Sequence, residues 1–174
     1  MTGVDIKELP LTADAAARSE HYAEVINAIQ LALEGESDWV AVMATVACLL
    51  HQAFEYYHWT GFFQAGPPGA DTLVIGPYQG HMGCLRIAYA RGVCGAAART
   101  RATQLVPDVS RFPGYIACAS STRSEVVVPV VEEGSGRLMA VLDIDSDHPA
   151  AFTEVDAKHL EELCAWLGRQ GYRS

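Results

Sequence analysis

The sequence predicts an α+β fold in which helices flank an antiparallel central sheet. Apolar residues recur at helical spacing near both ends of the chain, and four strand-like runs lie between these helical segments. The runs form two pairs, and a turn-rich segment joins the members of each pair, which favours hairpins and antiparallel pairing. With 174 residues, the chain is long enough for one domain with a buried core.

The first third of the chain predicts an arm and two helices. Residues 1–19 are expected to form the arm, and residues 20–170 the domain. A helix is expected over residues 14–34, where one apolar stripe consists of Tyr22, Val25, Ile26, Ile29 and Leu33. Ser37 is suited to cap a second helix over about residues 38–55. Because this second segment is apolar almost all round, we expect it to be well buried.

After His58 the pattern becomes strand-like. WTGFFQAG and TLVIGPYQG, joined by GPPGAD, predict a hairpin. GVCGAAART predicts a short helix, TQLVPDV a short strand, and FPGYIACASS a loop with one helical turn. A second hairpin is expected from SEVVVPVVEEG and GRLMAVLDIDS. A last helix should run from Thr153 to about residue 170, with Thr153 and Asp156 placed as a capping box.

The overall charge narrows the classes of partner. A formal charge of −9 argues against nucleic acid and anionic membrane as main partners, although four arginines cluster between Arg86 and Arg101. The longest apolar run, Trp39–Leu50, is too short to span a bilayer. The first residues, MTGVDIKELPL, lack the basic and apolar regions of a signal peptide, so a cytoplasmic location is expected.

The five cysteines fall into two groups. Cys48 and Cys164 lie on apolar helical segments and are expected to be small core residues. The other three lie in Cys84–Glu125, a segment rich in Gly, Ala, Arg and Ser between two apolar regions. No two cysteines are closely spaced, so in a reducing compartment we expect thiols at rest and a disulfide only as a transient, functional state.

The middle cysteines allow several interpretations. Cys94 follows Arg91 and is expected near a helix N-terminus, so the local sequence favours it as the most activated thiol. Three unrelated buried cysteines are one alternative. A zinc site formed by Cys84, Cys94, Cys118 and His81 is another, although structural zinc sites usually contain a close cysteine pair.

Three carboxylates are expected to meet at one end of the second hairpin. Asp143 and Asp145 alternate with Ile144 and therefore share a face of their strand. Counting outward from a turn near residues 134–135 places Glu125 roughly opposite Ile144, beside both aspartates. Close carboxylates repel, so at least one pKa should rise and leave a protonated acid near neutral pH. Solvated strand ends are the alternative.

Several motifs together resemble one enzyme family. HWTGFF, GPYQGHMGCLRI, RGVCGAAA, QLVPDV, FPGYIACASSTRSEVVVPV and GRLMAVLDIDS are similar to segments of the free methionine-(R)-sulfoxide reductases, which are GAF-domain enzymes. The resemblance covers about residues 20–167. It implies a single GAF domain that reduces the free amino acid methionine sulfoxide, at its R epimer, to methionine.

The resemblance also implies roles for the cysteines and the acid. Cys118 matches the nucleophile, Cys84 the main resolving cysteine and Cys94 an auxiliary resolving thiol. We expect Glu125 to protonate the sulfoxide oxygen while the Cys118 thiolate attacks sulfur, which gives a sulfenic acid. Cys84 then forms a disulfide with Cys118, and a thioredoxin-like dithiol reduces it. No cofactor and no metal are expected.

The remaining candidate residues are expected to bind the substrate. Asp143 and Asp145 suit its ammonium group, and Trp59, whose alternative role is core packing, its methyl group. Backbone N–H groups of the Tyr115–Cys118 turn, which contains Ile116 and Ala117, could bind the carboxylate. Residues 78–92 are a candidate lid.

Two readings without turnover remain open at this point. One is a GAF-type sensor that holds a small ligand, and the other is a thiol redox switch whose output is the disulfide itself. A homodimer is a further expectation, because many GAF domains pair through their terminal helices.

Overall fold

In the part of the chain that the structure describes, six strands form one antiparallel sheet, in the order β3-β2-β1-β6-β5-β4. The computed structural model describes residues 6–172. The strands are β1 Trp59–Ala65, β2 Thr72–Gln79, β3 Arg86–Ala88, β4 Gln104–Val106, β5 Ser124–Val131 and β6 Leu138–Ser146. The helices are α1 Ala15–Ala32, α2 Trp39–Ala53, α3 Gly92–Thr100 and α4 Glu154–Arg169, with a short 3-10 helix at Val109–Arg111. The predicted α+β class and both predicted hairpins are confirmed.

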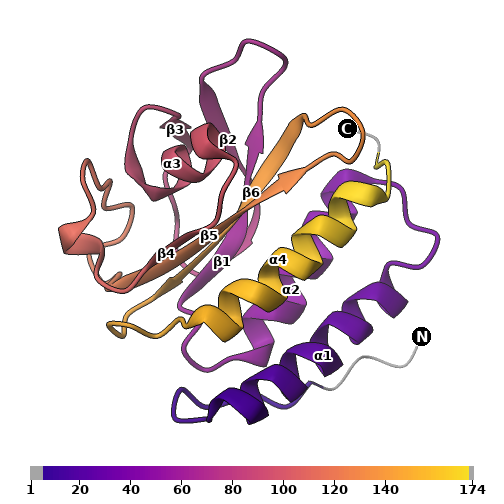
Figure 1. The fold of residues 1–174 in the computed structure, drawn as a ribbon, viewed down its shortest axis with the longest axis vertical. Coiled ribbons are helices and arrows are strands. Elements are labelled where there is room, and N and C mark those ends of the chain that lie inside the picture. The colour runs from indigo at the N-terminus through magenta and orange to yellow at the C-terminus, as the bar shows by residue number, and fades with distance from the viewer. Residues whose placement is uncertain (1–5, 173–174) are drawn as a thin grey trace.

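The helices are distributed unequally over the two faces of the sheet (Figure 1). α2 and α4 pack against one face, and α1 lies outside them as a further layer. Of the α-helices within the described residues, α3 alone covers the other face, beside β3. Each face therefore has its own core, and β6 runs between them with almost every side chain buried. A strand covered on both faces reads as a continuous apolar run, as LMAVLDIDS does apart from its two aspartates.

Local caps fix where the helices begin. The Asp14 side chain accepts a hydrogen bond from the N–H of Ala17 at the start of α1. The cap of α2 is Asp38 rather than the predicted Ser37, because the Asp38 carboxylate accepts from Ala41 N–H at 2.8 Å. The predicted capping box of Thr153 and Asp156 is confirmed at the start of α4.

Asp156 also anchors a buried polar network that the sequence did not indicate. Its side chain is fully buried and pairs with Arg18 of α1 at 2.8 Å. The hydroxyl groups of Tyr22 and Tyr56 each donate to the same carboxylate at 2.9 Å. Buried charge is tolerated only when it is paired and hydrogen-bonded, so this network ties α1, α4 and the end of α2 into one arrangement.

The β5–β6 hairpin differs from prediction by one residue. A register shift between Val130 and Val131 places Glu125 opposite Asp145 instead of Ile144. This shift decides the site, because moving a strand by one residue sends its side chains to the other face. Without it, Glu125 would face α2 and α4, whereas with it Glu125 shares a face with Asp143 and Asp145.

Four smaller predictions need correction or stay open. β3 was not predicted, and the helical turn lies at Val109–Arg111, before FPGYIACASS rather than within it. α2 is not buried all round: Val40 is exposed and Cys48 only partly buried. Residues 1–5 of the predicted arm lie outside the described part of the chain, and residues 15–19 belong to α1. The division into an arm and a domain stays a prediction.

Candidate active site

A small cavity lies between α3 and the sheet. Its volume is about 30 Å³, close to that of one water molecule. Residues of β3, α3, β5, β6 and the loop between the 3-10 helix and β5 line it: Ile87, Gly92, Val93, Cys94, Tyr115, Ile116, Cys118, Thr122, Glu125, Asp143 and Asp145. Seven of the ten residues predicted for the site line this cavity, and an eighth, Cys84, is bonded to one of the lining residues.

Cys84 and Cys118 form a disulfide, with their Cα atoms 5.3 Å apart. Cys84 lies between β2 and β3, and Cys118 lies in a tight turn in which its N–H donates to the carbonyl of Ile116 at 3.1 Å. Both cysteines are partly exposed. Because two of the three thiols of the alternative zinc site, Cys84 and Cys118, are bonded to each other, that site does not form in this structure.

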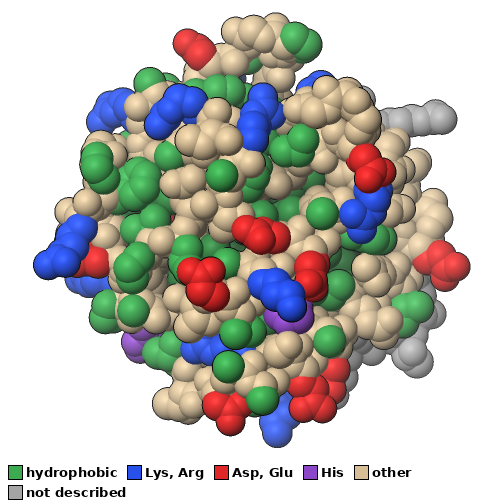
Figure 2. All heavy atoms as spheres, in the orientation of Figure 1, with side chains coloured by type: hydrophobic (Ala, Val, Ile, Leu, Met, Phe, Trp, Pro, Cys, Tyr) green, Lys and Arg blue, Asp and Glu red, His purple; other side chains and the backbone are tan. Residues whose placement is uncertain are grey.

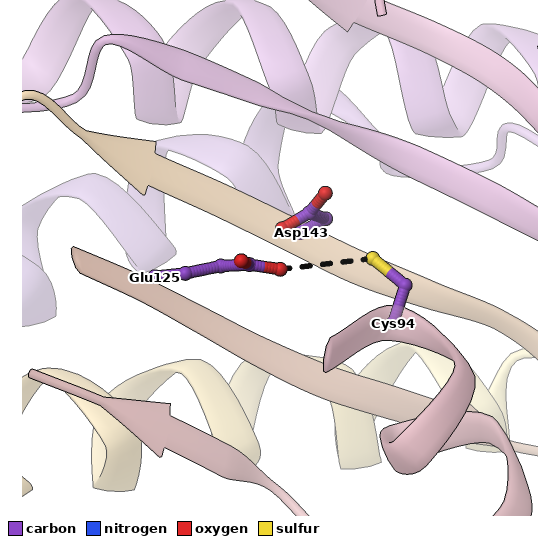
Figure 3. A group of neighbouring side chains, drawn as sticks. All are labelled: Cys94, Glu125 and Asp143. Atoms are coloured by element: carbon purple, nitrogen blue, oxygen red, sulfur yellow. Dashed lines mark hydrogen bonds between the residues drawn. The ribbon is translucent and has the colours of Figure 1, made fainter. Parts of the chain in front are cut away.

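The carboxylates gather beneath α3 as the register requires (Figure 3). Glu125 and Asp143 are buried, so solvated strand ends do not describe them. The sulfur of Cys94 lies 4.0 Å from Oε1 of Glu125, at the outer limit for a thiol hydrogen bond. Oδ1 of Asp143 is buried and, within the described chain, has no hydrogen-bond partner. The possible ligand atoms of Cys94, Glu125 and Asp143 lie within 4.8 Å of one another.

Burial and mutual repulsion favour the protonated forms of these groups. Burial first, and then the charges of Asp143 and Asp145, raise the pKa of Glu125 well above its ordinary value. Burial and the charge of Asp143 likewise raise the pKa of Asp145 well above its ordinary value. Burial raises the pKa of Asp143 to about 6, and hydrogen bonding with Cys94 and Glu125 limits the rise. The three raised pKa values together favour a protonated carboxyl group in this cluster, as the sequence predicts.

Cys94 is not an activated thiol in this structure, which contradicts the local prediction. It does lie in the first turn of α3, as expected. However, burial, followed by the charges of Asp143 and Glu125, raises its pKa well above the ordinary value. A helix N-terminus favours a thiolate by a small amount, whereas two carboxylates in a buried pocket oppose it more strongly.

Trp59 and Ala117 do not line the cavity. Trp59 lies opposite Asp145 in the sheet and is buried against the segment that carries Cys84. Its indole N–H donates to the carbonyl of His81 at 2.9 Å, and its ring would meet a Cβ placed on Gly83 at 3.3 Å. Trp59 therefore supports the segment before Cys84, while Ala117 is exposed beside Cys118.

Four lining residues were not predicted: Ile87, Gly92, Val93 and Thr122. Gly92 carries a recognisable signal, because a glycine at the first position of a helix suits an unusual backbone conformation. Its φ is +68°, and a Cβ there would meet the side chain of Ile116 at 3.3 Å. The close approach of α3 to the Cys118 loop depends on this glycine.

Comparisons with known proteins agree with this geometry. The chain matches the GAF domain family over residues 29–170. The free methionine-R-sulfoxide reductase of Saccharomyces cerevisiae is 36% identical over 154 residues, which make up 84% of this chain and 85% of the yeast protein. Its namesake from Escherichia coli is 37% identical over 150 residues, 86% of this chain and 88% of that protein.

A solved structure extends the likeness to three dimensions. The free methionine-R-sulfoxide reductase of Neisseria meningitidis, in complex with its substrate, superposes with a TM-score of 0.87. It is 38% identical, and the match covers 98% of this chain and 96% of that one. Fold, sequence and relatives agree: this chain belongs to the GAF-domain family and, within it, to the free methionine-R-sulfoxide reductases.

Proposed function

We propose that this protein reduces free methionine-R-sulfoxide to methionine through thiol chemistry at Cys118. One observation carries the proposal: the Cys84–Cys118 disulfide borders a cavity in which buried carboxyl groups hold raised pKa values. A sulfoxide is a weak electrophile until its oxygen receives a proton, so a thiol and a protonated acid are both needed. This site brings the two together.

In the first step, Glu125 donates its proton to the sulfoxide oxygen while the Cys118 thiolate attacks the sulfur. The oxygen moves to Cys118, which becomes a sulfenic acid, and methionine is released as the reduced product. The Cys84 thiol then attacks the Cys118 sulfur and expels the oxygen as water, which leaves the disulfide. Each turnover therefore needs two electrons from an external dithiol.

The same carboxylates explain a preference for the free amino acid. Oδ1 of Asp143 has no partner among the described residues, so the substrate ammonium would supply the missing donor. Asp145 lies two residues further along β6 on the same face and offers a further carboxyl group to the ammonium. Backbone N–H groups of the Tyr115–Ala117 turn are proposed to bind the substrate carboxylate. A peptide-bound methionine sulfoxide lacks the ammonium and would leave a buried carboxylate unpaired.

The disulfide state corresponds to the end of a turnover. A cavity of about 30 Å³ is far too small for methionine sulfoxide. Reduction frees Cys84, and we propose that the segment around Cys84 then moves to admit the substrate. Residues 78–92 act as the lid only in part, because Arg86–Ala88 pair with β2 in the sheet.

We assign Cys94 a role different from the resolving role that the resemblance implies. Its buried thiol stays protonated and faces Glu125, so it acts as a hydrogen-bond donor that positions the Glu125 carboxyl group. A protonated thiol is a poor nucleophile, and Cys84 already occupies the bonding position on Cys118.

Three proposals concern the surroundings of the enzyme. The electron donor is a thioredoxin-like dithiol, because the chemistry requires one. We also propose that two copies pair through their terminal helices and that the protein is cytoplasmic, as expected from the sequence. No helix in the described part of the chain has the length and apolar character needed to cross a membrane.

Cysteine variants test the mechanism directly. In a single turnover without reductant, Cys118→Ser should form no methionine, whereas Cys84→Ser should form about one equivalent per protein and retain a sulfenic acid. A sulfenic acid reagent and mass spectrometry of tryptic peptides locate the modified residue. A Cys94–Cys118 disulfide in Cys84→Ser would contradict the role given to Cys94, and methionine formation by Cys118→Ser would contradict the mechanism. A ligand sensor without turnover predicts no methionine from any form.

A further inference from the structure

The surface around Cys84 is unusually apolar for an exposed segment. Among the described residues, four large hydrophobic side chains are exposed: Leu31, Val40, Met82 and Leu85, at 65%, 57%, 73% and 60%. Two of the four, Met82 and Leu85, flank Cys84 in the chain. Exposed apolar side chains gathered at a reactive group indicate a contact surface more strongly than scattered ones do.

The backbone holds these side chains outward. The carbonyl of His81, next to Met82, accepts the indole N–H of Trp59 at 2.9 Å. The carbonyl of Leu85 accepts the N–H of Ile75 from β2 at 3.0 Å. Because both ends of the segment are tied to the sheet in the disulfide state, a partner meets a preorganised surface and loses little entropy on binding.

The charge of this region is opposite to that of the whole protein. Residues 72–107 contain four arginines and no aspartate or glutamate, although the chain as a whole has a formal charge of −9. Arg86, Arg91, Arg99 and Arg101 are all exposed. In Figure 2, blue Lys and Arg side chains gather at the upper left, the area where Figure 1 shows β3 and α3. An acidic partner would therefore be steered toward the disulfide.

We propose that Met82, Leu85 and Arg86, named here the Cys84 rim, form the docking site for the protein dithiol that reduces the enzyme. This inference rests on the proposed function, which leaves a disulfide after each turnover. The partner is a thioredoxin-class protein whose surface beside its two cysteines is apolar and bears acidic groups. It has to be a protein, because a small thiol needs no contact surface of this kind.

Docking on this rim directs the exchange to Cys84. The thiolate of the reductant attacks the Cys84 sulfur, forms a mixed disulfide with it and releases Cys118 as a thiolate. The second thiol of the reductant then attacks the sulfur of the reductant's first cysteine in the mixed disulfide. This step frees Cys84 as a thiol and leaves the reductant with an internal disulfide. This order returns Cys118 in the charge state that the next turnover requires.

The test compares a protein reductant with a small one. Met82→Gln and Leu85→Gln, singly and combined, are assayed with thioredoxin, thioredoxin reductase and NADPH, and separately with dithiothreitol. Leu31→Gln and Val40→Gln are matched controls, because they remove equally exposed apolar side chains from the helical side of the molecule. We expect the thioredoxin concentration for half-maximal rate to rise about fivefold or more in the double variant. Rates with dithiothreitol and the rates of both controls should stay within about twofold of the wild type.

The outcomes separate this inference from the proposed function. If the double variant depended on thioredoxin concentration as the wild type does, the docking site would be overturned. The proposed function would still stand, provided that the wild type forms methionine with dithiothreitol. An equal loss with both reductants would also overturn the docking site, since the rim would then serve the substrate or the fold. Failure of the wild type to form methionine with dithiothreitol would overturn the function itself. A thioredoxin variant lacking its second cysteine should be trapped on Cys84, and trapping on Cys118 would contradict the order of exchange.

Discussion

Glu125 is an acid because of its surroundings. An isolated glutamic acid is ionised at neutral pH, but burial and the nearby charges of Asp143 and Asp145 oppose ionisation here. The three groups titrate together, so the proton belongs to the cluster and Glu125 is the member best placed to hold it. Such a cluster lowers the free energy of unfolding but supplies the proton donor that the reaction needs.

Replacing Glu125 by glutamine should remove the acid with little change in shape. We expect the rate of methionine formation in a single turnover to fall by about 10²–10³-fold. In the wild type, the rate should decline as the pH rises through the raised pKa of Glu125, because only the protonated form donates. Glu125→Gln should lack that decline. A variant with the wild-type rate and the same alkaline decline would show that another group supplies the proton.

Asp143 should lower the stability of the protein at neutral pH. Folding raises its pKa from 3.8 to about 6, so the folded state binds more protons than the unfolded state between these values. Stability contributed by this residue is therefore lost as the pH rises from about 4 to above 6. We expect Asp143→Asn to be more stable than the wild type at pH 7.5 by about 1–3 kcal/mol, at the expense of activity.

Urea unfolding of the oxidised protein at several pH values measures this effect. The gain should shrink as the pH is lowered toward 4, where the folded state holds the proton and the unfolded state begins to bind it. The exposed Asp147 supplies the control, and Asp147→Asn should change the free energy of unfolding by less than about 0.5 kcal/mol. A destabilised Asp143→Asn at pH 7.5 would show that the carboxylate has a stabilising partner.

Among the elements, those with local signals could be predicted from the sequence. Hydrophobic periodicity and caps gave α1, α4 and both hairpins, because these depend on neighbours in the chain. The register of β5 against β6 could not be predicted by counting from the turn. The shift at Val130 and Val131 belongs to a sheet whose other face carries α4, and Gly168 of that helix touches this end of β5. β3 was missed because three residues carry too little pattern.

The Asp156 network connects α4 to α1 and to the end of α2, so its removal tests how strongly these helices are held together. Asp156→Ala would leave the Arg18 charge buried without its partner, and it would also remove the Asp156 half of the capping box of α4. We expect a loss of about 3–5 kcal/mol in the free energy of unfolding, measured by urea denaturation. Because the site lies on the other face of the sheet, the molecules that remain folded should reduce the substrate at the wild-type rate.

A second acid on the same helix provides the comparison. The exposed side chain of Glu162 pairs with His159 at 3.4 Å, so Glu162→Ala should cost less than about 1 kcal/mol. If Asp156→Ala were as stable as Glu162→Ala, the buried network would not hold the helices together. A change in the rate of the folded molecules would mean that the two faces of the sheet are coupled.

At the scale of the whole molecule, stability and chemistry occupy opposite faces of one sheet. The core under α1, α2 and α4 contains most of the large apolar side chains. The smaller core under α3 contains Trp59, Cys94 and the disulfide, and its cavity holds the destabilising carboxylates. A firm helical face lets the protein tolerate an active site that costs free energy.

The sequence predicted the members of the site better than their arrangement. The cysteines, Glu125 and the aspartates stand out as residue types in unusual places, and the resemblance supplied the pairing of Cys84 with Cys118. Contacts between residues far apart in the chain could not be predicted from the sequence. The contacts of Trp59 with the Cys84 segment and of Gly92 with Ile116 depend on tertiary packing. The pKa of Cys94 was misjudged for the same reason, since its carboxylate neighbours are distant in the chain.

The most direct test of the account is the fate of the two epimers. Reduced protein is mixed with a diastereomeric mixture of free methionine sulfoxide and dithiothreitol, and both epimers and methionine are followed by chiral chromatography. We expect methionine to form in step with loss of the R epimer, while the S epimer and N-acetylated methionine sulfoxide persist. Persistence of both epimers, or their loss at equal rates, would contradict it.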